Sequence, residues 1–176
     1  RSTLFPYTTL FRSLELACRI RSYAQAGRNP LGAVHGAEAM KYAEARDVLY
    51  GWVQAFWAGT SYAPLQWEGT PETVPTADAV WGRVSVRHSR GWHNSLTGAH
   101  GCIRYGRRGT LWVQVFAPIG AQHGAGYEAA QGVVNALQAA KHPNVWLHNI
   151  GLREVDSSGA FQQINVTAIF EYDEVM

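Results

Sequence analysis

The sequence predicts an α+β fold in which two helices pack on one face of a mainly antiparallel sheet. Three segments carry this prediction. Residues 110–116 alternate apolar and polar side chains, residues 124–141 repeat small or apolar side chains at helical spacing, and residues 161–172 alternate again. A period of two predicts a strand and a period near 3.6 predicts a helix. We therefore expect the C-terminal part of the chain to contain one helix with strands before and after it.

A second helix and two further extended segments come earlier in the chain. Residues 41–58 place their apolar side chains on one broad stripe, which predicts an amphipathic helix that ends at Gly59. Residues 65–68 are expected to form a short extended segment. Residues 79–87 predict a strand with valines on one face and Trp81, Arg83 and Arg87 on the other.

The connections are predicted from their polar, glycine and proline residues. Residues 89–101 are polar and are expected to form a long excursion between two strands. The next strand is expected to begin at residues 102–105, with a turn or bulge at residues 107–109. Residues 145–154 predict another strand, and residues 156–159 predict a hairpin turn.

The first 39 residues are expected to lie outside the folded domain. Residues 1–13 resemble a translated sequencing adapter, and Met40 directly precedes the first strong helical pattern, so we expect the protein to start at Met40. Residues 1–39 contain five arginines and two glutamates, which leaves ten basic and eleven acidic residues in 40–176. The basic balance of the whole chain is therefore no evidence that the domain at 40–176 binds nucleic acid.

Composition limits the class of protein. The chain is 47% hydrophobic, which is typical of a folded domain, and it holds seven tryptophans and eight tyrosines, residues that suit interfaces. No apolar run is long enough to predict a membrane span. Two cysteines, Cys18 and Cys102, do not make a disulfide framework, and this favours a reducing compartment.

One cluster of residues suggests catalysis or metal binding. His88, His93, His100 and Cys102 lie within fifteen residues of one another, and a small metal- or Cys/His-dependent hydrolase is one alternative. Their spacing does not match the short paired spacings of structural zinc sites. No acidic residue lies between Asp78 and Glu128 to orient a histidine. We therefore expect no catalytic residue, no metal and no cofactor.

The same acid-free window is strongly basic. Between residues 79 and 127 the only charged side chains are six arginines, at positions 83, 87, 90, 104, 107 and 108. Charge that is segregated in this way favours assembly between subunits or non-specific contact with a phosphate backbone. The alternative is an ordinary mixed surface, if the fold interleaves the basic window with the acidic segments on either side.

Several segments together resemble the tail terminator family of long-tailed bacteriophages. They are the opening helix with Ala-Arg-Asp-Val-Leu at 45–49, the strand Trp-Gly-Arg-Val-Ser-Val at 81–86, and Arg-Arg-Gly-Thr-Leu-Trp-Val-Gln-Val-Phe-Ala-Pro-Ile-Gly at 107–120. The helix at 126–140 and the closing strand at 163–174 complete the pattern. The resemblance extends over about residues 41–175.

This resemblance implies an α+β subunit that assembles into a ring, typically a hexamer. Such a ring caps the tail tube, stops its growth and provides the surface that joins the head. The implied partners are further copies of the chain, the tail tube protein and a head-completion or connector protein, with DNA passing by non-specific contact only. The implied location is the virion tail, assembled in the host cytoplasm. The family offers no catalytic residues to transfer.

The residues expected at a subunit interface or channel are Arg83, Arg87, Arg104, Arg107, Arg108, Trp112 and Phe116. The two aromatic residues lie on the strand face opposite Leu111, Val113 and Val115. Another head–tail connector or minor tail protein remains an alternative, and so does a free nucleic-acid-binding module.

Overall fold

In the part of the chain that the structure describes, five strands form one sheet. The computed structural model describes residues 40–70, 79–94, 103–120, 124–158 and 160–175. The elements follow the chain as α2 (Tyr42–Ala58), β1 (Gln66–Trp67), β2 (Trp81–His93), β3 (Arg104–Pro118), α3 (Gly124–Ala139), β4 (Val145–Ser158) and β5 (Phe161–Val175). The strand order in the sheet is β1-β2-β3-β5-β4. Of these described strands, β1 and β2 pair in parallel and the other pairs are antiparallel. The predicted fold class is confirmed.

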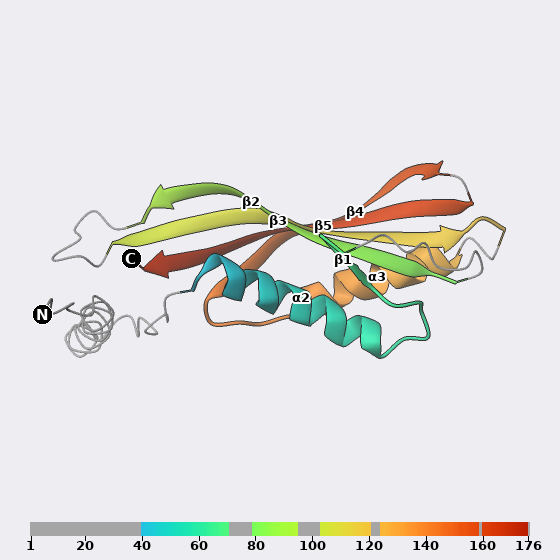
Figure 1. Cartoon of the computed structure of the whole chain (residues 1–176), viewed down its shortest axis with the longest axis horizontal. Coiled ribbons are helices and arrows are strands. Elements are labelled where there is room, and N and C mark those ends of the chain that lie inside the picture. The colour runs from blue at the N-terminus through green and yellow to red at the C-terminus, as the bar shows by residue number, and fades with distance from the viewer. Residues whose placement is uncertain (1–39, 71–78, 95–102, 121–123, 159, 176) are drawn as a thin grey trace, which may run out of the picture.

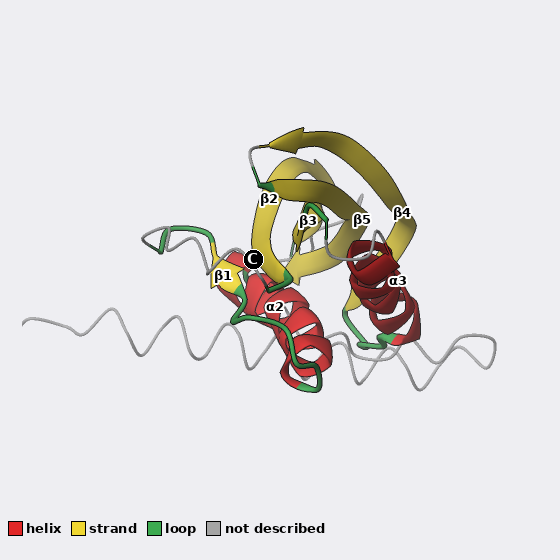
Figure 2. Cartoon of the chain, turned by 90° about the vertical axis from the view of Figure 1, so that its right-hand side faces the viewer, coloured by secondary structure: helices red, strands yellow, loops and turns green. Residues whose placement is uncertain are grey.

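Both helices lie on the same side of the twisted sheet (Figures 1 and 2). The apolar stripe of α2 and the buried side of α3 face the alternating apolar residues of β2, β3 and β5. The fully buried residues of the core include Leu49, Val53, Val84, Leu111, Val113, Val115, Val133, Ile164, Val166 and Phe170. We call this side the helix-side face, and the other side, which carries Arg83 and Trp112, the open face.

Two glycines allow close approach on the helix-side face. A Cβ atom at Gly126 of α3 would lie 2.9 Å from the Cβ of Ala117, so glycine lets this helix rest on the sheet. A Cβ atom at Gly109 of β3 would lie 2.3 Å from the backbone oxygen of Arg87 and from a ring carbon of Phe170. Such distances are sterically forbidden, and the Phe170 ring therefore occupies the space that a side chain at position 109 would need.

The excursion predicted at residues 89–101 is wrong in its first part. β2 continues from His88 to His93, and the pairing with β3 shifts by one residue between His88 and Arg90. Ser89 is the extra residue of a β-bulge. The segment is polar because it extends past the helical layer, and its side chains from Ser89 to His93 are exposed. Alternation of apolar and polar residues, the signal used for strands, is lost in such a segment.

The predicted irregularity at residues 107–109 is also misplaced. β3 runs unbroken from Arg104 to Pro118 and pairs with β5 along its whole length. The bulge lies instead in the neighbouring strand β2. Gly109 serves the packing of Phe170 and not a turn. The hairpin between β4 and β5 is tighter than predicted, because β4 continues to Ser158 and pairs there with Phe161.

The start of α2 and the chain after it are fixed by local hydrogen bonds. The Glu44 carboxylate accepts a hydrogen bond of 2.9 Å from the backbone N–H of Lys41, which satisfies a donor at the beginning of the helix. The indole N–H of Trp57 donates to the carbonyl oxygen of Ala63 at 2.8 Å. Among the described residues, no helix combines the length and hydropathy needed to cross a bilayer.

Two glycine substitutions should have opposite effects on stability. Gly51 lies exposed within α2 with nothing near its missing Cβ, so Gly51→Ala should raise the free energy of unfolding by about 0.5–1 kcal/mol. Gly109→Ala should lower it by about 1–3 kcal/mol, because the new Cβ collides with backbone and ring atoms. Urea unfolding of both variants measures the difference. Equal effects of the two substitutions would contradict the packing described at Gly109.

Candidate functional site

The open face is the side of the sheet that neither α2 nor α3 covers (Figure 2). Strand alternation places every second residue there. The pairing of the strands sets Ser85 beside Trp112, and Trp112 beside Thr167. Because Ser85 and Thr167 are short, the tryptophan ring between them stays 39% exposed.

Two further tryptophans are exposed on the same face. Trp92 of β2 lies opposite Gly106 of β3, and Trp146 of β4 lies opposite Glu171 of β5. Their exposed fractions are 37% and 47%. Of these three tryptophans, the sequence predicted only Trp112 at an interface. Trp92 was expected in a loop, and the face on which Trp146 lies follows only from the pairing of β4 with β5. Exposed tryptophans on one uncovered surface are typical of protein interfaces.

Phe116, the second aromatic residue predicted at an interface, takes part in a cluster within the subunit. Its ring stacks on Trp81 with centroids 4.0 Å apart and an interplanar angle of 11°. The Phe161 ring meets Trp81 edge-on at 6.0 Å. The Arg83 guanidinium lies 5.9 Å from the centroid of Trp81 and 6.0 Å from that of Phe116. Arg83 and Phe116 thus stabilise one end of the open face.

The charge segregation of the sequence does not persist in the fold. β3 pairs antiparallel with β5, which sets residues 104–108 beside residues 171–175. The resulting ion pairs join Arg104 to Asp173 at 3.5 Å, Arg107 to Glu174 at 2.6 Å and Arg108 to Glu171 at 3.6 Å. Arg87 pairs with Glu68 at 2.7 Å. The basic window and the acidic segments are therefore interleaved, as the alternative interpretation required.

Arg107 differs from the other predicted arginines because it lies on the helix-side face. Adjacent residues of a strand point to opposite faces, so Arg107 and Arg108 are separated by the sheet. The Arg107 side chain is 17% exposed and binds Glu174 through Nε and Nη2. Its guanidinium lies 5.1 Å from the ring centroid of Tyr42 and 5.3 Å from that of Tyr105. Arg107 therefore ties α2, β3 and β5 together.

The open face still carries more positive than negative charge. Among the side chains that the structure describes, strand register places six arginines and three acidic residues there: Arg83, Arg87, Arg90, Arg104, Arg108 and Arg153, with Glu68, Glu171 and Asp173. Glu171 also lies 3.6 Å from Nε2 of His148. Arginine and tryptophan are the residue types most enriched at protein contacts. The open face therefore combines both.

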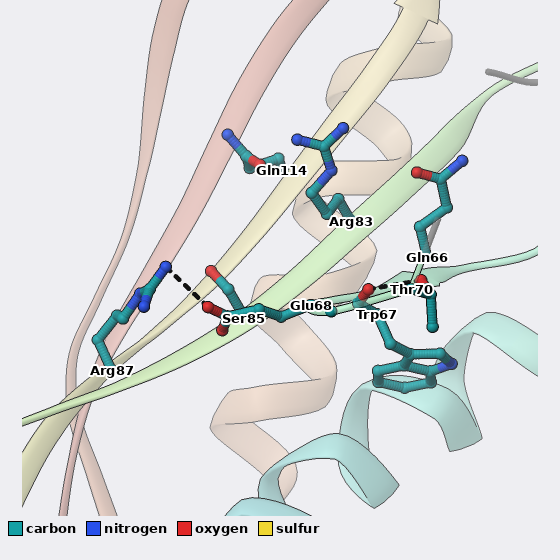
Figure 3. A pocket seen from close by; sticks show the side chains of 9 residues that line it. Gln66, Trp67, Glu68, Thr70, Arg83, Ser85, Arg87 and Gln114 are labelled. Carbon is teal, nitrogen blue, oxygen red and sulfur yellow. Dashed lines mark hydrogen bonds and ion pairs between the residues drawn. The ribbon is translucent and has the colours of Figure 1, made fainter. Parts of the chain in front are cut away.

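A polar groove of about 300 Å³ opens on this face where β1 meets β2. It is lined by Gln66, Trp67, Glu68, Gly69, Thr70, Arg83, Ser85, Arg87 and Gln114. Figure 3 shows the side chains of Gln66, Arg83 and Gln114 in a row across β1, β2 and β3, and a dashed line marks the Arg87–Glu68 ion pair. The Trp67 ring turns towards α2 and contacts Tyr50, with centroids 4.7 Å apart. The lining offers amide, hydroxyl and charged groups for polar contacts.

His88 lies in an aromatic cage on the helix-side face. Its ring centroid is 4.7 Å from that of Tyr42, 5.1 Å from Phe170 and 5.8 Å from Tyr172. The Nε2 atom is buried and has no hydrogen-bond partner within the described ranges. Burial, and then the nearby positive charge of Arg107, lower the pKa of His88. Burial also raises the pKa of Tyr172 beyond its ordinary range.

The residues of the suggested hydrolase site are only partly described. His88 and His93 both lie on the helix-side face, and the His93 ring contacts Tyr105 with centroids 4.6 Å apart. His100 and Cys102 lie outside the described residues. Within the described ranges, no three His, Cys, Asp or Glu side chains are grouped so that they suit a metal ion.

Comparison with known proteins gives a structural similarity alone. No protein-family model matches the chain, and no curated protein matches it. A solved structure whose name states no function aligns with a TM-score of 0.51 and 19% identity, over 72% of this chain and 94% of that one. At this identity the similarity supports the fold only. The class that the fold and the open face define is an α+β protein with an aromatic, arginine-rich sheet surface.

The two neighbouring arginines should contribute unequally to stability. Arg107→Gln should lower the free energy of unfolding by about 1–3 kcal/mol, because it leaves the largely buried Glu174 carboxylate without its charged donor. Arg108→Gln should change it by less than about 0.5 kcal/mol, since its ion pair is longer and more exposed. Chemical denaturation of the two single variants measures this. An equal loss in both would refute the assignment of opposite faces.

Acid should destabilise the fold through His88. The folded state lowers the pKa of this histidine from the ordinary value of 6.5, so the unfolded chain binds the proton more readily. The stabilisation from neutral His88 is complete above pH 6.5 and is lost as the pH falls towards the folded-state pKa. His88→Phe keeps an aromatic ring in the cage and should remove this part of the pH dependence. If the stability difference between wild type and His88→Phe is the same at pH 7.5 and pH 5, the burial of His88 is misassigned.

Proposed function

We propose that this chain is the tail terminator of a long-tailed bacteriophage, a ring-forming subunit that ends growth of the tail tube and offers the surface for head joining. The observation that carries the proposal is the open face, on which Trp92, Trp112 and Trp146 are exposed beside an excess of arginine. The resemblance of residues 41–175 to that family supplies the functional class. No step of the proposal requires catalysis.

The open face suits contact with another protein more than contact with solvent. Tryptophan and arginine give large contact area and several hydrogen bonds at modest entropic cost, and they dominate the energy of many interfaces. The central position of Trp112, between the short side chains of Ser85 and Thr167, makes it accessible to a flat partner. We assign the open face to the contact with the tube protein at the end of the tail tube. Its additional arginines allow non-specific contact with DNA phosphates that pass nearby.

A ring of identical subunits needs two different patches on each copy. The full-length chain, purified and concentrated, should form closed rings with a central channel, seen by native mass spectrometry and negative-stain electron microscopy. A single mass equal to a small multiple of the chain is the expected result. Monomers at every concentration, or open-ended filaments, would contradict the proposal.

The open face should be needed for capping the tube. Added to growing tubes of the same phage's tail tube protein, the wild-type chain should stop elongation. Trp112→Ala should weaken capping at least tenfold, since interface tryptophans contribute about 2 kcal/mol or more. Ile119→Ala, which truncates an exposed apolar residue beyond the end of β3, is the matched control and should cap normally. Full capping by Trp112→Ala with unchanged circular dichroism would assign the tube contact elsewhere.

A further inference from the structure

The sheet has two long edges without a described strand neighbour. On one side, β1 pairs with β2 only at Arg83 and Val84, so the nine residues from Ser85 to His93 have no partner there among the described strands. On the other side, β4 pairs with β5 and has no further described strand beside it. At about 3.3 Å per residue, the 85–93 edge alone is ~30 Å long. Each edge presents backbone donors and acceptors to a partner.

The β4 edge lacks several of the features that keep strands from pairing with other chains. Natural edges are usually short, or carry proline or charged side chains, especially lysine. β4 is 14 residues long and contains no lysine or proline, and its charged residues are Arg153, Glu154 and Asp156. It also exposes Trp146, Leu152 and Val155, by 47%, 37% and 37%. Two irregularities, between His148 and Gly151 and between Val155 and Ser158, interrupt its pairing with β5. An exposed edge of this length with three exposed apolar side chains favours pairing with another strand.

The direction of the strands defines which partner fits. β2, β3, β5 and β4 alternate in direction, because each pair is antiparallel. The first and last of these four strands therefore run in opposite directions. A second copy placed beside β4 by rotation about an axis along the strands brings its β2 next to β4 in antiparallel orientation. The sheet then continues across the contact with the pairing that it already uses within each subunit.

The other two pairings are less suitable. Antiparallel pairing of β2 with β2 of a second copy brings four arginines, Arg87 and Arg90 of both copies, together on one face, and like charges across strands destabilise the pair. The described residues of β4 bring one arginine, Arg153, to that face, so the β4-to-β2 contact carries less repulsion. Pairing of β4 with β4 buries the apolar edge but closes at a dimer and leaves both β2 edges open. Only the β4-to-β2 contact uses both edges of every copy.

We propose that copies of this chain join edge to edge, with β4 of one copy pairing antiparallel with residues 85–93 of the next. This inference rests on the proposed ring and specifies the strands that form each contact. Each contact adds a ladder of backbone hydrogen bonds and covers Trp146, Leu152 and Val155. The sheets of all copies then form one continuous wall around the ring axis, and the open faces of all copies lie on the same side of that wall.

Disulfide trapping tests which strands pair between copies and which of their residues lie on the same face of the joined sheet. In a full-length chain with Cys18→Ser and Cys102→Ser, Arg153→Cys is combined with Ser85→Cys, Arg87→Cys or Arg90→Cys, all on the open face. One of these combinations should give a ladder of cross-linked multimers on oxidation, since paired strands hold Cα atoms within disulfide distance. Glu154→Cys with the same β2 cysteine is the matched control. It should not cross-link, because residue 154 lies on the opposite face.

The results separate this inference from the proposed ring. Rings in native mass spectra without any same-face ladder would overturn the edge contact and leave the ring intact. Cross-linking of Arg153→Cys alone into dimers would assign the contact to β4 with β4 and overturn it as well. Absence of both rings and ladders would overturn the ring itself. As an independent check, Leu152→Lys with Val155→Lys should abolish rings while circular dichroism is unchanged, and Ile119→Lys should keep them.

Discussion

The pairing of β3 with β5 is the constraint on which the rest of the structure depends. Fifteen residues of β3, from Arg104 to Pro118, pair with β5 in one unbroken antiparallel register. This register sends Leu111, Val113 and Val115 to the helices and Trp112 to the open face. It also sets the arginines of β3 beside the acids of β5. A shift by one residue would exchange the buried and exposed sets along the strand.

The sequence was sufficient for the fold class because long segments have strong periodicity. Both helices and the strands around Val113 and Val166 were predicted from alternation or helical spacing, and the structure confirms them. The prediction failed between Ser89 and His93, because strand residues that extend beyond the helical layer are exposed on both faces. Periodic hydrophobicity arises only where one face is buried.

The candidate surface was harder to predict, because it depends on which strands are neighbours. The excess of arginine between residues 79 and 127 was visible in the sequence, but the partners Glu68, Glu171, Asp173 and Glu174 are distant in the chain. Arg107 and Arg108 look equivalent in sequence and differ in the fold. Trp92 and Trp146 join Trp112 only when β2 and β4 have been placed. A sequence signal for Trp146 was its position at the start of an apolar strand, but its face follows from the pairing with Glu171.

The central claim is that the open face meets the tube protein at the end of the tail tube while the strand edges join neighbouring copies. Electron cryomicroscopy of the chain bound to tube ends tests it most directly. The account predicts a closed ring in which Trp112 is buried against the tube protein and the helices α2 and α3 face away from it. A reconstruction in which the helices contact the tube and Trp112 faces solvent would contradict it.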